Sequence, residues 1–207
     1  MAMSVRVKIC GITSLADAEA AIQAGADALG FVFCEASPRC LSTQSAALIC
    51  ADLPPFVVKV GLFVNPTQSI MAETLNACRI DVVQLHGDES PEFCSAVPRP
   101  VIKAFRIRDK SSLKELAAYP GATWLLDSYV AGKLGGTGEQ FNWELARRAV
   151  QSSSRIILAG GLTPANVATA VRQVRPYAVD VSSGVESAPG RKDRQKLEDF
   201  VRAAKEA

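Results

Sequence analysis

The sequence predicts a closed (β/α)8 barrel, the TIM-barrel architecture of the α/β class. Eight short apolar runs recur along the chain, each is followed by a helical or nearly helical segment, and neither a linker nor a second sheet pattern interrupts the series. A chain of 207 residues is short for this architecture but sufficient for one large core, so we expect a single domain over residues 1–207. The regular alternation favours the closed barrel over an open doubly wound sheet.

The first predicted strand is the run Val7-Lys8-Ile9, which ends at Cys10. Side chains of a strand alternate between its two faces, so Lys8 and Cys10 share one face while Val7 and Ile9 share the other. We therefore expect the apolar face to pack against helices and the polar face to point toward a functional site.

The remaining elements follow from apolar periodicity and from Ser, Thr, Pro and Gly at the element ends. Strands are predicted over 28–33, 57–63, 82–85, 101–105, 123–126, 156–159 and 178–181. Helices are predicted over 15–24, from 43 to near 54, from 67 to about 78, after 91, over 112–118 and 143–150, from 163, and over 193–204. The segment 128–141 is the longest connection and contains four glycines, so we expect a functional lid there.

The composition excludes several classes of partner. Hydrophobic residues make up 48% of the chain, charged residues 21%, and the formal net charge is only +2, so we expect neither nucleic acid nor a membrane surface as a partner. The sequence shows no signal peptide and no apolar run that would span a bilayer. The six cysteines form no Cys-x-x-Cys pair and one histidine is present, so we expect no metal site and free thiols in a reducing cytoplasm.

The candidate site lies where the predicted strands end, because active sites of such barrels form at the C-terminal ends of the strands. Small and polar residues occur at or just beyond these ends. They are Cys10, Arg39, His86, Asp127, Gly160, Gly161, Asp180, Ser182, Ser183 and Gly184. Residues far apart in sequence are therefore expected to converge at one mouth of the barrel.

The loops after the seventh and eighth strands are suited to a phosphate group. Gly160-Gly161 and Ser182-Ser183-Gly184 are small enough for backbone N–H groups to approach phosphate oxygens, and a helix N-terminus adds positive potential. The alternative is that these residues only form turns. The run Gly135-Gly136-Thr137-Gly138 lacks the Lys-Ser/Thr of a P-loop, so we interpret it as part of the lid.

Three side chains are the chemical candidates. Arg39 carries a planar fork that matches a carboxylate, although a loop arginine is often only a surface residue. Asp127 would face Cys10 across the barrel mouth as a general acid, the alternative being a structural cap or ion pair. Cys10 ends the first predicted strand on its polar face, so we predict that it has a chemical role and is not merely a small buried hydrophobe.

Two further polar residues accompany them. The last strand adjoins the first in a closed barrel, so we expect Asp180 to pair with Lys8. We hypothesise that this pair offsets the cost of burying the lysine and that Lys8 adds positive potential toward the Cys10 thiolate. His86 has two open interpretations: it orients a substrate hydroxyl, or it only satisfies hydrogen bonds at the mouth.

Four sequence blocks carry a likeness that covers nearly the whole chain, with Ser37-Pro38-Arg39 and Leu158-Ala159-Gly160-Gly161-Leu162 between them. The blocks are Lys8-Ile9-Cys10-Gly11-Ile12-Thr13, Gln84-Leu85-His86-Gly87-Asp88-Glu89, Gly135-Gly136-Thr137-Gly138 before Phe141-Asn142-Trp143, and Asp180-Val181-Ser182-Ser183-Gly184-Val185-Glu186 before Pro189-Gly190-Arg191-Lys192-Asp193. In this order the chain resembles the phosphoribosylanthranilate isomerase family of tryptophan biosynthesis.

The resemblance implies an Amadori rearrangement without a cofactor, in which N-(5-phosphoribosyl)anthranilate becomes 1-(2-carboxyphenylamino)-1-deoxyribulose 5-phosphate. By resemblance, Asp127 protonates the furanose ring oxygen and Cys10 removes the C2' proton. Arg39 would hold the anthranilate carboxylate, and the loops after strands seven and eight would hold the phosphate. Cys40 departs from the family, which commonly has an aromatic residue after Ser-Pro-Arg, so we expect looser packing beside the anthranilate ring.

The implied partner is a small molecule with phosphate and carboxylate groups, and we expect a monomer or a homodimer. Two other functions stay open. One is the phosphosugar isomerase of histidine biosynthesis, whose members typically use a carboxylate where this chain has Cys10. The other is a non-catalytic phospholigand-binding barrel, which would not require a thiol and a carboxylate at the mouth.

Overall fold

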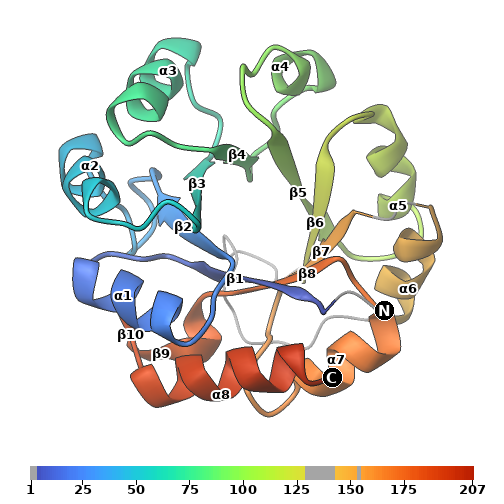
Figure 1. The fold of residues 1–207 in the computed structure, drawn as a ribbon. Helices are drawn as coiled ribbons and strands as arrows, with labels where there is room; N and C mark the ends of the chain where they lie inside the picture. The colour runs from blue at the N-terminus through green and yellow to red at the C-terminus, as the bar shows by residue number, and fades with distance from the viewer. Residues whose placement is uncertain (1–3, 129–142, 153–154) are drawn as a thin grey trace.

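The structure, a computed structural model, describes residues 4–128, 143–152 and 155–207. Its centre is a closed barrel of eight parallel strands in sequence order, in which the last strand pairs with the first (Figure 1). The strands are β1 (Arg6–Cys10), β2 (Ala28–Val32), β3 (Val58–Phe63), β4 (Val82–Leu85), β5 (Val101–Ile107), β6 (Thr123–Ser128), β7 (Ile156–Leu158) and β8 (Ala178–Val181). The predicted barrel is confirmed.

A ring of helices surrounds the strands (Figure 1). These are α1 (Leu15–Gln23), α2 (Thr43–Ala51), α3 (Gln68–Ala77), α4 (Pro91–Ser95), α5 (Ser112–Glu115) with the 3-10 turn η1 (Leu116–Ala118), α6 (Trp143–Ser152), α7 (Val167–Val174) and α8 (Arg194–Lys205). Side-chain oxygens cap most N-termini, as Ser14 does for α1 and Asp193 for α8. In the described part of the chain, no helix has the length and apolar character needed to cross a membrane.

The alternation of side chains along the strands divides the core into two regions. Val7 and Ile9 belong to the large apolar cluster between barrel and helices, as predicted. Inward-facing residues, among them Val60, Ile102 and Leu125, fill the barrel interior. This apolar layer fills the inside of the barrel. The inward-facing polar residues lie beyond it, toward the C-terminal ends of the strands, where they can form a site at the mouth.

Several predicted boundaries differ from the structure. β5 and β6 each extend two residues further, because Arg106 pairs with Asp127 and Ile107 with Ser128 in a continued parallel register. The helix predicted to open at Thr163 begins at Val167 instead. Asn166 accepts a hydrogen bond from the Thr163 N–H, so a turn precedes this helix. Apart from Ser128, the segment 128–141 predicted to be a lid lies outside the described residues.

One element has no counterpart in the prediction. After β8 the chain forms the 3-10 turn η2 (Ser183–Val185) and then a small antiparallel hairpin of β9 (Glu186–Ala188) and β10 (Arg191–Lys192). The turn between these two strands contains Gly190, whose φ of +78° suits a residue without Cβ. Strands of three and two residues are too short to show an alternating pattern, so periodicity does not reveal them.

Candidate active site

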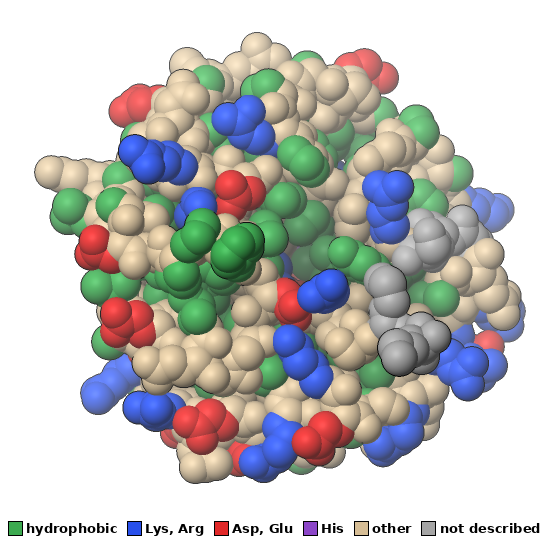
Figure 2. Space-filling view, in the orientation of Figure 1, with side chains coloured by type: hydrophobic (Ala, Val, Ile, Leu, Met, Phe, Trp, Pro, Cys, Tyr) green, Lys and Arg blue, Asp and Glu red, His purple; other side chains and the backbone are tan. Residues whose placement is uncertain are grey.

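A cavity of about 480 Å³ lies at the C-terminal ends of the barrel strands. Figure 2 shows one face of the molecule, on which apolar side chains gather near the middle with charged side chains around them. All ten residues predicted for the site line this cavity: Cys10, Arg39, His86, Asp127, Gly160, Gly161, Asp180, Ser182, Ser183 and Gly184. The barrel therefore brings together residues that the sequence separates by up to most of its length.

Cys10 and Lys8 are the inward-facing residues at the end of β1. The Lys8 Nζ donates a hydrogen bond of 2.6 Å to the Asp180 Oδ1, across the register in which Lys8 is paired with Asp180 on β8. A Cβ added to Gly30 on the neighbouring strand would lie 2.8 Å from the Cys10 Sγ and 3.1 Å from the Lys8 Nζ. Gly30 thus leaves the space in which thiol and ammonium lie together, and the predicted pair of Lys8 with Asp180 is present.

The environment of Cys10 acts on its thiol in two directions. Burial raises the pKa of Cys10, and the Asp180 carboxylate also acts to raise it, while the positive charges of Lys8 and Lys192 act to lower it. Burial prevails, so the pKa lies above the ordinary value rather than near neutrality. The sign of the predicted Lys8 effect agrees with the structure, but burial makes the Cys10 thiol a weaker acid than a free cysteine, with a raised pKa.

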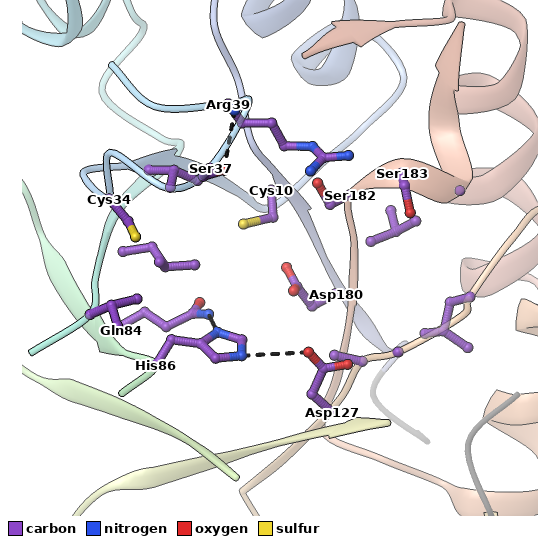
Figure 3. Close-up of a pocket in the computed structure, with 18 of the residues that line it drawn as sticks. Cys10, Cys34, Ser37, Arg39, Gln84, His86, Asp127, Asp180, Ser182 and Ser183 are labelled. Atoms are coloured by element: carbon purple, nitrogen blue, oxygen red, sulfur yellow. Dashed lines mark hydrogen bonds and ion pairs between the residues drawn. The ribbon is translucent and has the colours of Figure 1, made fainter. Parts of the chain in front are cut away.

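Asp127 ends the inward-facing series of β6 and lies in a row with two residues of the β4 end. Figure 3 shows Gln84 beside His86, and His86 beside Asp127. The Gln84 Nε2 is 3.2 Å from the His86 Nδ1, and the His86 Nε2 is 3.5 Å from the Asp127 Oδ2. If the Gln84 amide donates, the His86 Nδ1 accepts and its Nε2 carries the proton that faces Asp127.

Three polar atoms of this row have no hydrogen-bond partner among the described residues. They are the Gln84 Oε1, the His86 Nε2 and the Asp127 Oδ1, and all three atoms are buried. Buried polar atoms are normally satisfied, so unsatisfied ones that line a cavity point to a ligand with hydroxyl or similar groups. These three residues are therefore suited to bind a polar ligand and to exchange a proton with it.

Arg39 lies in the loop after β2 and crosses the end of β1. Its Nε and NH2 each donate a hydrogen bond of 2.7 Å to the two oxygens of Glu186. One side of the guanidinium that we predicted to bind a substrate carboxylate is therefore already occupied by Glu186. Arg39 still lines the cavity, and the donors on its outer end are not used by Glu186.

The loops after β7 and β8 contact each other closely. A Cβ added to Gly184 would lie 1.9 Å from the carbonyl oxygen of Leu162, so only glycine fits there. Gly160 and Gly161 have φ values of +82° and +66°, and no described residue accepts a hydrogen bond from the N–H of either. Such N–H groups, together with the start of η2, can receive the oxygens of a phosphate group.

A thiol, a carboxylate, a guanidinium and exposed backbone N–H groups thus surround one cavity, a set suited to acid–base chemistry on a doubly anionic sugar phosphate. No three His, Cys, Asp or Glu side chains cluster as metal ligands in the residues that the structure describes. The family model described as N-(5'phosphoribosyl)anthranilate (PRA) isomerase matches residues 7–203. The chain belongs to the phosphoribosylanthranilate isomerase family.

Individual relatives agree with this membership. The N-(5'-phosphoribosyl)anthranilate isomerase of Geobacter metallireducens is 60% identical over 201 residues, which cover 97% of this chain and 99% of that protein. A crystal structure of phosphoribosyl anthranilate isomerase from Thermotoga maritima has a TM-score of 0.93 and 40% identity, over 98% of this chain and 100% of that chain. The resemblance predicted from the sequence blocks is confirmed.

A second solved phosphoribosyl anthranilate isomerase is described in complex with reduced 1-(o-carboxyphenylamino)-1-deoxyribulose 5-phosphate. It has a TM-score of 0.90 and 40% identity, over 98% of this chain and 100% of that chain. A barrel of nearly this geometry therefore accommodates a phosphate and a carboxylate on one ligand.

One wall of the cavity is apolar in this phosphoribosylanthranilate isomerase family member. Val32, Cys34, Leu62 and Val64 line it, whereas Cys40 does not. The Cys40 side chain is half-buried, and its Sγ lies 3.8 Å from the carbonyl oxygen of Leu41. The Cys40 side chain thus does not line the cavity, and the expected looser packing beside the anthranilate ring stays a prediction.

Three polar residues at or beside the site were not predicted. Gln84 lies on β4 between Val83 and Leu85, and a polar residue on an otherwise apolar strand is a sequence signal for an inward-facing functional position. Glu186 and Lys192 lie on the short hairpin after β8. The Pro189-Gly190 turn between two charged flanks was the only sequence signal for that hairpin.

Proposed function

We propose that this chain converts N-(5'-phosphoribosyl)anthranilate to 1-(2-carboxyphenylamino)-1-deoxyribulose 5-phosphate by general acid–base catalysis, as a step of tryptophan biosynthesis. The observation that carries the proposal is the position of Cys10 and Asp127 in one cavity between the glycine loops and Arg39. Neither group needs a bound cofactor for a proton transfer.

Asp127 is the proposed general acid. Its proton passes to the furanose ring oxygen, the bond between that oxygen and C1' breaks, and the nitrogen electron pair forms a C1'=N iminium. The Asp127 Oδ1 is buried and has no hydrogen-bond partner among the described residues, so it is available to a sugar oxygen. His86 borders the other carboxylate oxygen and keeps the carboxyl group oriented toward the cavity.

Cys10 is the proposed general base. Its thiolate removes the C2' proton, the electron pair of that C–H bond forms a C1'=C2' bond, and the positive charge on nitrogen is neutralised. The resulting enolamine tautomerises to the 2'-ketone. Burial raises the pKa of Cys10, so the reactive thiolate is a minor but strongly basic form, and Lys8 stabilises it.

The remaining contacts orient the substrate. The N–H groups of the loops after β7 and β8 would donate hydrogen bonds to the phosphate, and Arg39 would donate to the anthranilate carboxylate. The apolar wall of Val32, Leu62 and Val64 would face the aromatic ring. Asp180 and His86 line the same cavity and would contact the sugar hydroxyls, so we favour a role of His86 in substrate binding over a purely local one.

The wider expectations remain predictions: one domain over residues 1–207, a cytoplasmic location, and a monomer or a homodimer. Of the two alternative functions, the histidine-pathway isomerase is disfavoured by the thiol at position 10. A non-catalytic phospholigand barrel is disfavoured by the paired thiol and carboxylate. Turnover decides between these functions.

The test is the loss of fluorescence of freshly prepared N-(5'-phosphoribosyl)anthranilate on mixing with the protein. We expect rapid loss with the wild-type chain, and a decrease in kcat of at least about a hundredfold for Cys10→Ala and for Asp127→Ala, the scale of a lost general base or acid. Circular dichroism checks that each variant folds.

Cys94→Ala on α4 and Asp199→Ala on α8 serve as controls, because both residues lie outside the cavity. Both control variants should retain turnover. Near-wild-type turnover by Cys10→Ala or Asp127→Ala would contradict the residue assignment, and a wild-type chain that leaves the substrate unchanged would contradict the function itself.

A further inference from the structure

Glu186 is a buried carboxylate at the edge of the site that the proposed proton transfers do not use. Its Oε1 accepts hydrogen bonds from the Arg39 Nε at 2.7 Å and from the Lys192 Nζ at 2.9 Å, and its Oε2 accepts one from the Arg39 NH2 at 2.7 Å. Burial alone would raise the pKa of Glu186, but hydrogen bonds from Arg39 and Lys192 hold it below the ordinary value. Glu186 is therefore an anion shared by two cations.

The path of the Arg39 side chain is fixed as well. A Cβ added to Gly11 would lie 2.4 Å from the Arg39 Cδ and 3.3 Å from its Cγ, so the arginine stem occupies the space above Gly11. Gly11 has a φ of +75°, which favours glycine for a second reason. The aliphatic part of the Arg39 side chain passes over the end of β1, and Glu186 accepts hydrogen bonds from the guanidinium at the far end.

Lys192 completes the arrangement without offering a donor to a substrate. Its side chain is fully buried, and its Nζ donates to the Cys10 carbonyl at 2.6 Å, to the Ser182 carbonyl at 3.3 Å and to the Glu186 Oε1 at 2.9 Å. An ammonium group has three N–H donors, and here all three are used. Lys192 thus joins the backbone at the ends of β1 and β8 to the carboxylate that holds Arg39.

The hairpin that carries Glu186 and Lys192 is anchored to its surroundings. The Lys192 N–H donates to the Asp17 Oδ2 at 3.2 Å, and the Lys196 Nζ donates to the Glu186 carbonyl at 2.8 Å. The Thr13 hydroxyl donates to the Gly190 carbonyl. Contacts on both strands and on the turn hold the hairpin, so Glu186 is a fixed acceptor rather than a mobile surface group.

We propose that Glu186 is the positioning residue that sets the carboxylate specificity of the site, by holding Arg39 so that only the outer end of its guanidinium faces the substrate. A guanidinium has five N–H donors; Glu186 takes two along one side, and three remain on NH1 and NH2. Those two nitrogens form an end-on fork for the anthranilate carboxylate. This inference rests on the proposed function, in which Arg39 receives that carboxylate.

The net charge of this group of residues also favours binding of a carboxylate by Arg39. Arg39 and Lys192 carry two positive charges and Glu186 one negative charge, so one positive charge is left for an incoming carboxylate. Replacing Glu186 by glutamine leaves one good acceptor oxygen and introduces an N–H2 group that faces a cation. Arg39 then loses one of its two fork bonds and is held less firmly, which raises the ordering cost of binding a carboxylate.

The test compares two substrates, freshly condensed from ribose 5-phosphate with anthranilate or with aniline, the second of which lacks the carboxylate. Product formation is followed chromatographically for both. We expect the wild-type chain to favour the carboxylated substrate in kcat/KM by about tenfold or more, the scale of a charge-assisted bidentate contact. Glu186→Gln should lower this ratio by at least about fivefold, mainly through the KM of the carboxylated substrate.

Arg39→Met should remove the preference, and adding Glu186→Gln to it should change the ratio no further. Glu186→Asp, which keeps the charge but shortens the side chain, should lower the ratio in the same direction and serves if the glutamine variant does not fold. The matched control is Glu89→Gln, another buried carboxylate whose Oε2 pairs with a lysine, Lys103, at 3.0 Å. It should leave the ratio unchanged.

The possible results distinguish a wrong role for Glu186 from a wrong proposed function. If Glu186→Gln lowers kcat/KM for both substrates by the same factor, Glu186 is only structural and the inference is overturned. A preference that survives Arg39→Met, or one that Glu89→Gln reduces as much, also overturns it while turnover stands. A wild-type chain that converts neither substrate refutes the proposed function, and the inference with it.

Discussion

Cys10 shows at the scale of one residue how neighbours set reactivity. Desolvation favours the neutral thiol, whereas Lys8 favours the thiolate from a position fixed by Asp180. Although burial would lower the pKa of Lys8, the negative partners around it hold that pKa above the ordinary value, so the lysine is charged at the pH at which Cys10 must react. The thiolate is therefore formed beside a permanent positive charge.

Removal of that charge should make Cys10 less reactive. In Lys8→Met the attraction for the thiolate is lost and Asp180 is left without its partner, and both changes raise the pKa of Cys10. We expect its alkylation by iodoacetamide, followed by peptide mass spectrometry, to slow by about tenfold or more at pH values below the ordinary thiol pKa, as for the loss of an opposite charge at close range.

The control for this prediction is Lys59→Met at the start of β3, where the lysine pairs with Asp81 at 3.4 Å and does not line the cavity. Its Cys10 alkylation profile should match the wild type. An unchanged Cys10 alkylation profile in Lys8→Met would show that Lys8 only supports the fold and does not stabilise the Cys10 thiolate.

The residues proposed for direct chemical roles were the ones whose positions the sequence predicted best. Cys10, Asp127 and Arg39 stand at strand ends, and the barrel pattern alone places such residues at one mouth. The partners of these residues were harder to predict. Glu186 holds Arg39 from a segment 147 positions away along the chain, and no local periodicity reports so distant an ion pair. Burial and pKa direction also depend on packing that the sequence does not show.

At the scale of elements, the loops after β7 and β8 act as one unit. Gly184 in η2 lies so close to the Leu162 carbonyl that a single added methyl group would collide with the backbone. Asn166 braces the first loop, because its side chain accepts from the Thr163 N–H at 2.8 Å and donates to the Gly161 carbonyl at 2.9 Å. The N–H groups proposed for phosphate are thus prearranged.

Gly184→Ala should separate these two loops. The rigid carbonyl of Leu162 cannot move away as a flexible side chain would, so we expect a loss of roughly 1–3 kcal/mol in the free energy of unfolding, as for overpacked sites. We also expect a KM about tenfold higher, the scale of one lost hydrogen bond to a charged group. Thermal denaturation and inhibition by inorganic phosphate measure the two effects.

Gly121→Ala is the matched control. Gly121 has a φ of +88°, but a Cβ there would meet nothing within 4 Å. This variant should lose some stability through backbone strain and keep the wild-type KM and phosphate inhibition. If Gly184→Ala kept the wild-type phosphate inhibition, the loops after β7 and β8 would not be the phosphate site.

Elements with strong local signals were predicted well, and elements with weak signals were not. The four-residue strand β4 and the eight-strand order matched, whereas the ends of β5 and β6 were placed two residues early. Arg106 and Asp127 are polar, and a polar residue in sequence looks like the end of a strand. In the barrel they continue the register as partners on the inward face, in line with Ala104 and Leu125, where the two strands run on toward the mouth.

At the scale of the whole molecule, closure of the barrel makes the site. The pairing of β1 with β8 brings Lys8 to Asp180 across 172 positions of sequence. The same closure places Cys10 of β1 and Asp127 of β6 around one cavity (Figure 3). An open sheet would separate its first and last strands, so the proposed acid and base depend on the closed architecture that the strand pattern predicted.

A crystal structure of this chain with reduced 1-(2-carboxyphenylamino)-1-deoxyribulose 5-phosphate bound would test most directly whether Cys10 and Asp127 are the base and the acid. In that complex the Cys10 Sγ should lie against C2', and an Asp127 carboxylate oxygen should lie within hydrogen-bond distance, about 2.6–3.2 Å, of the oxygen on C4' that was the ring oxygen. The phosphate should contact the N–H groups of Gly161 and Ser183. A ligand bound with C2' facing a residue other than Cys10, or with Asp127 remote from that oxygen, would contradict this assignment.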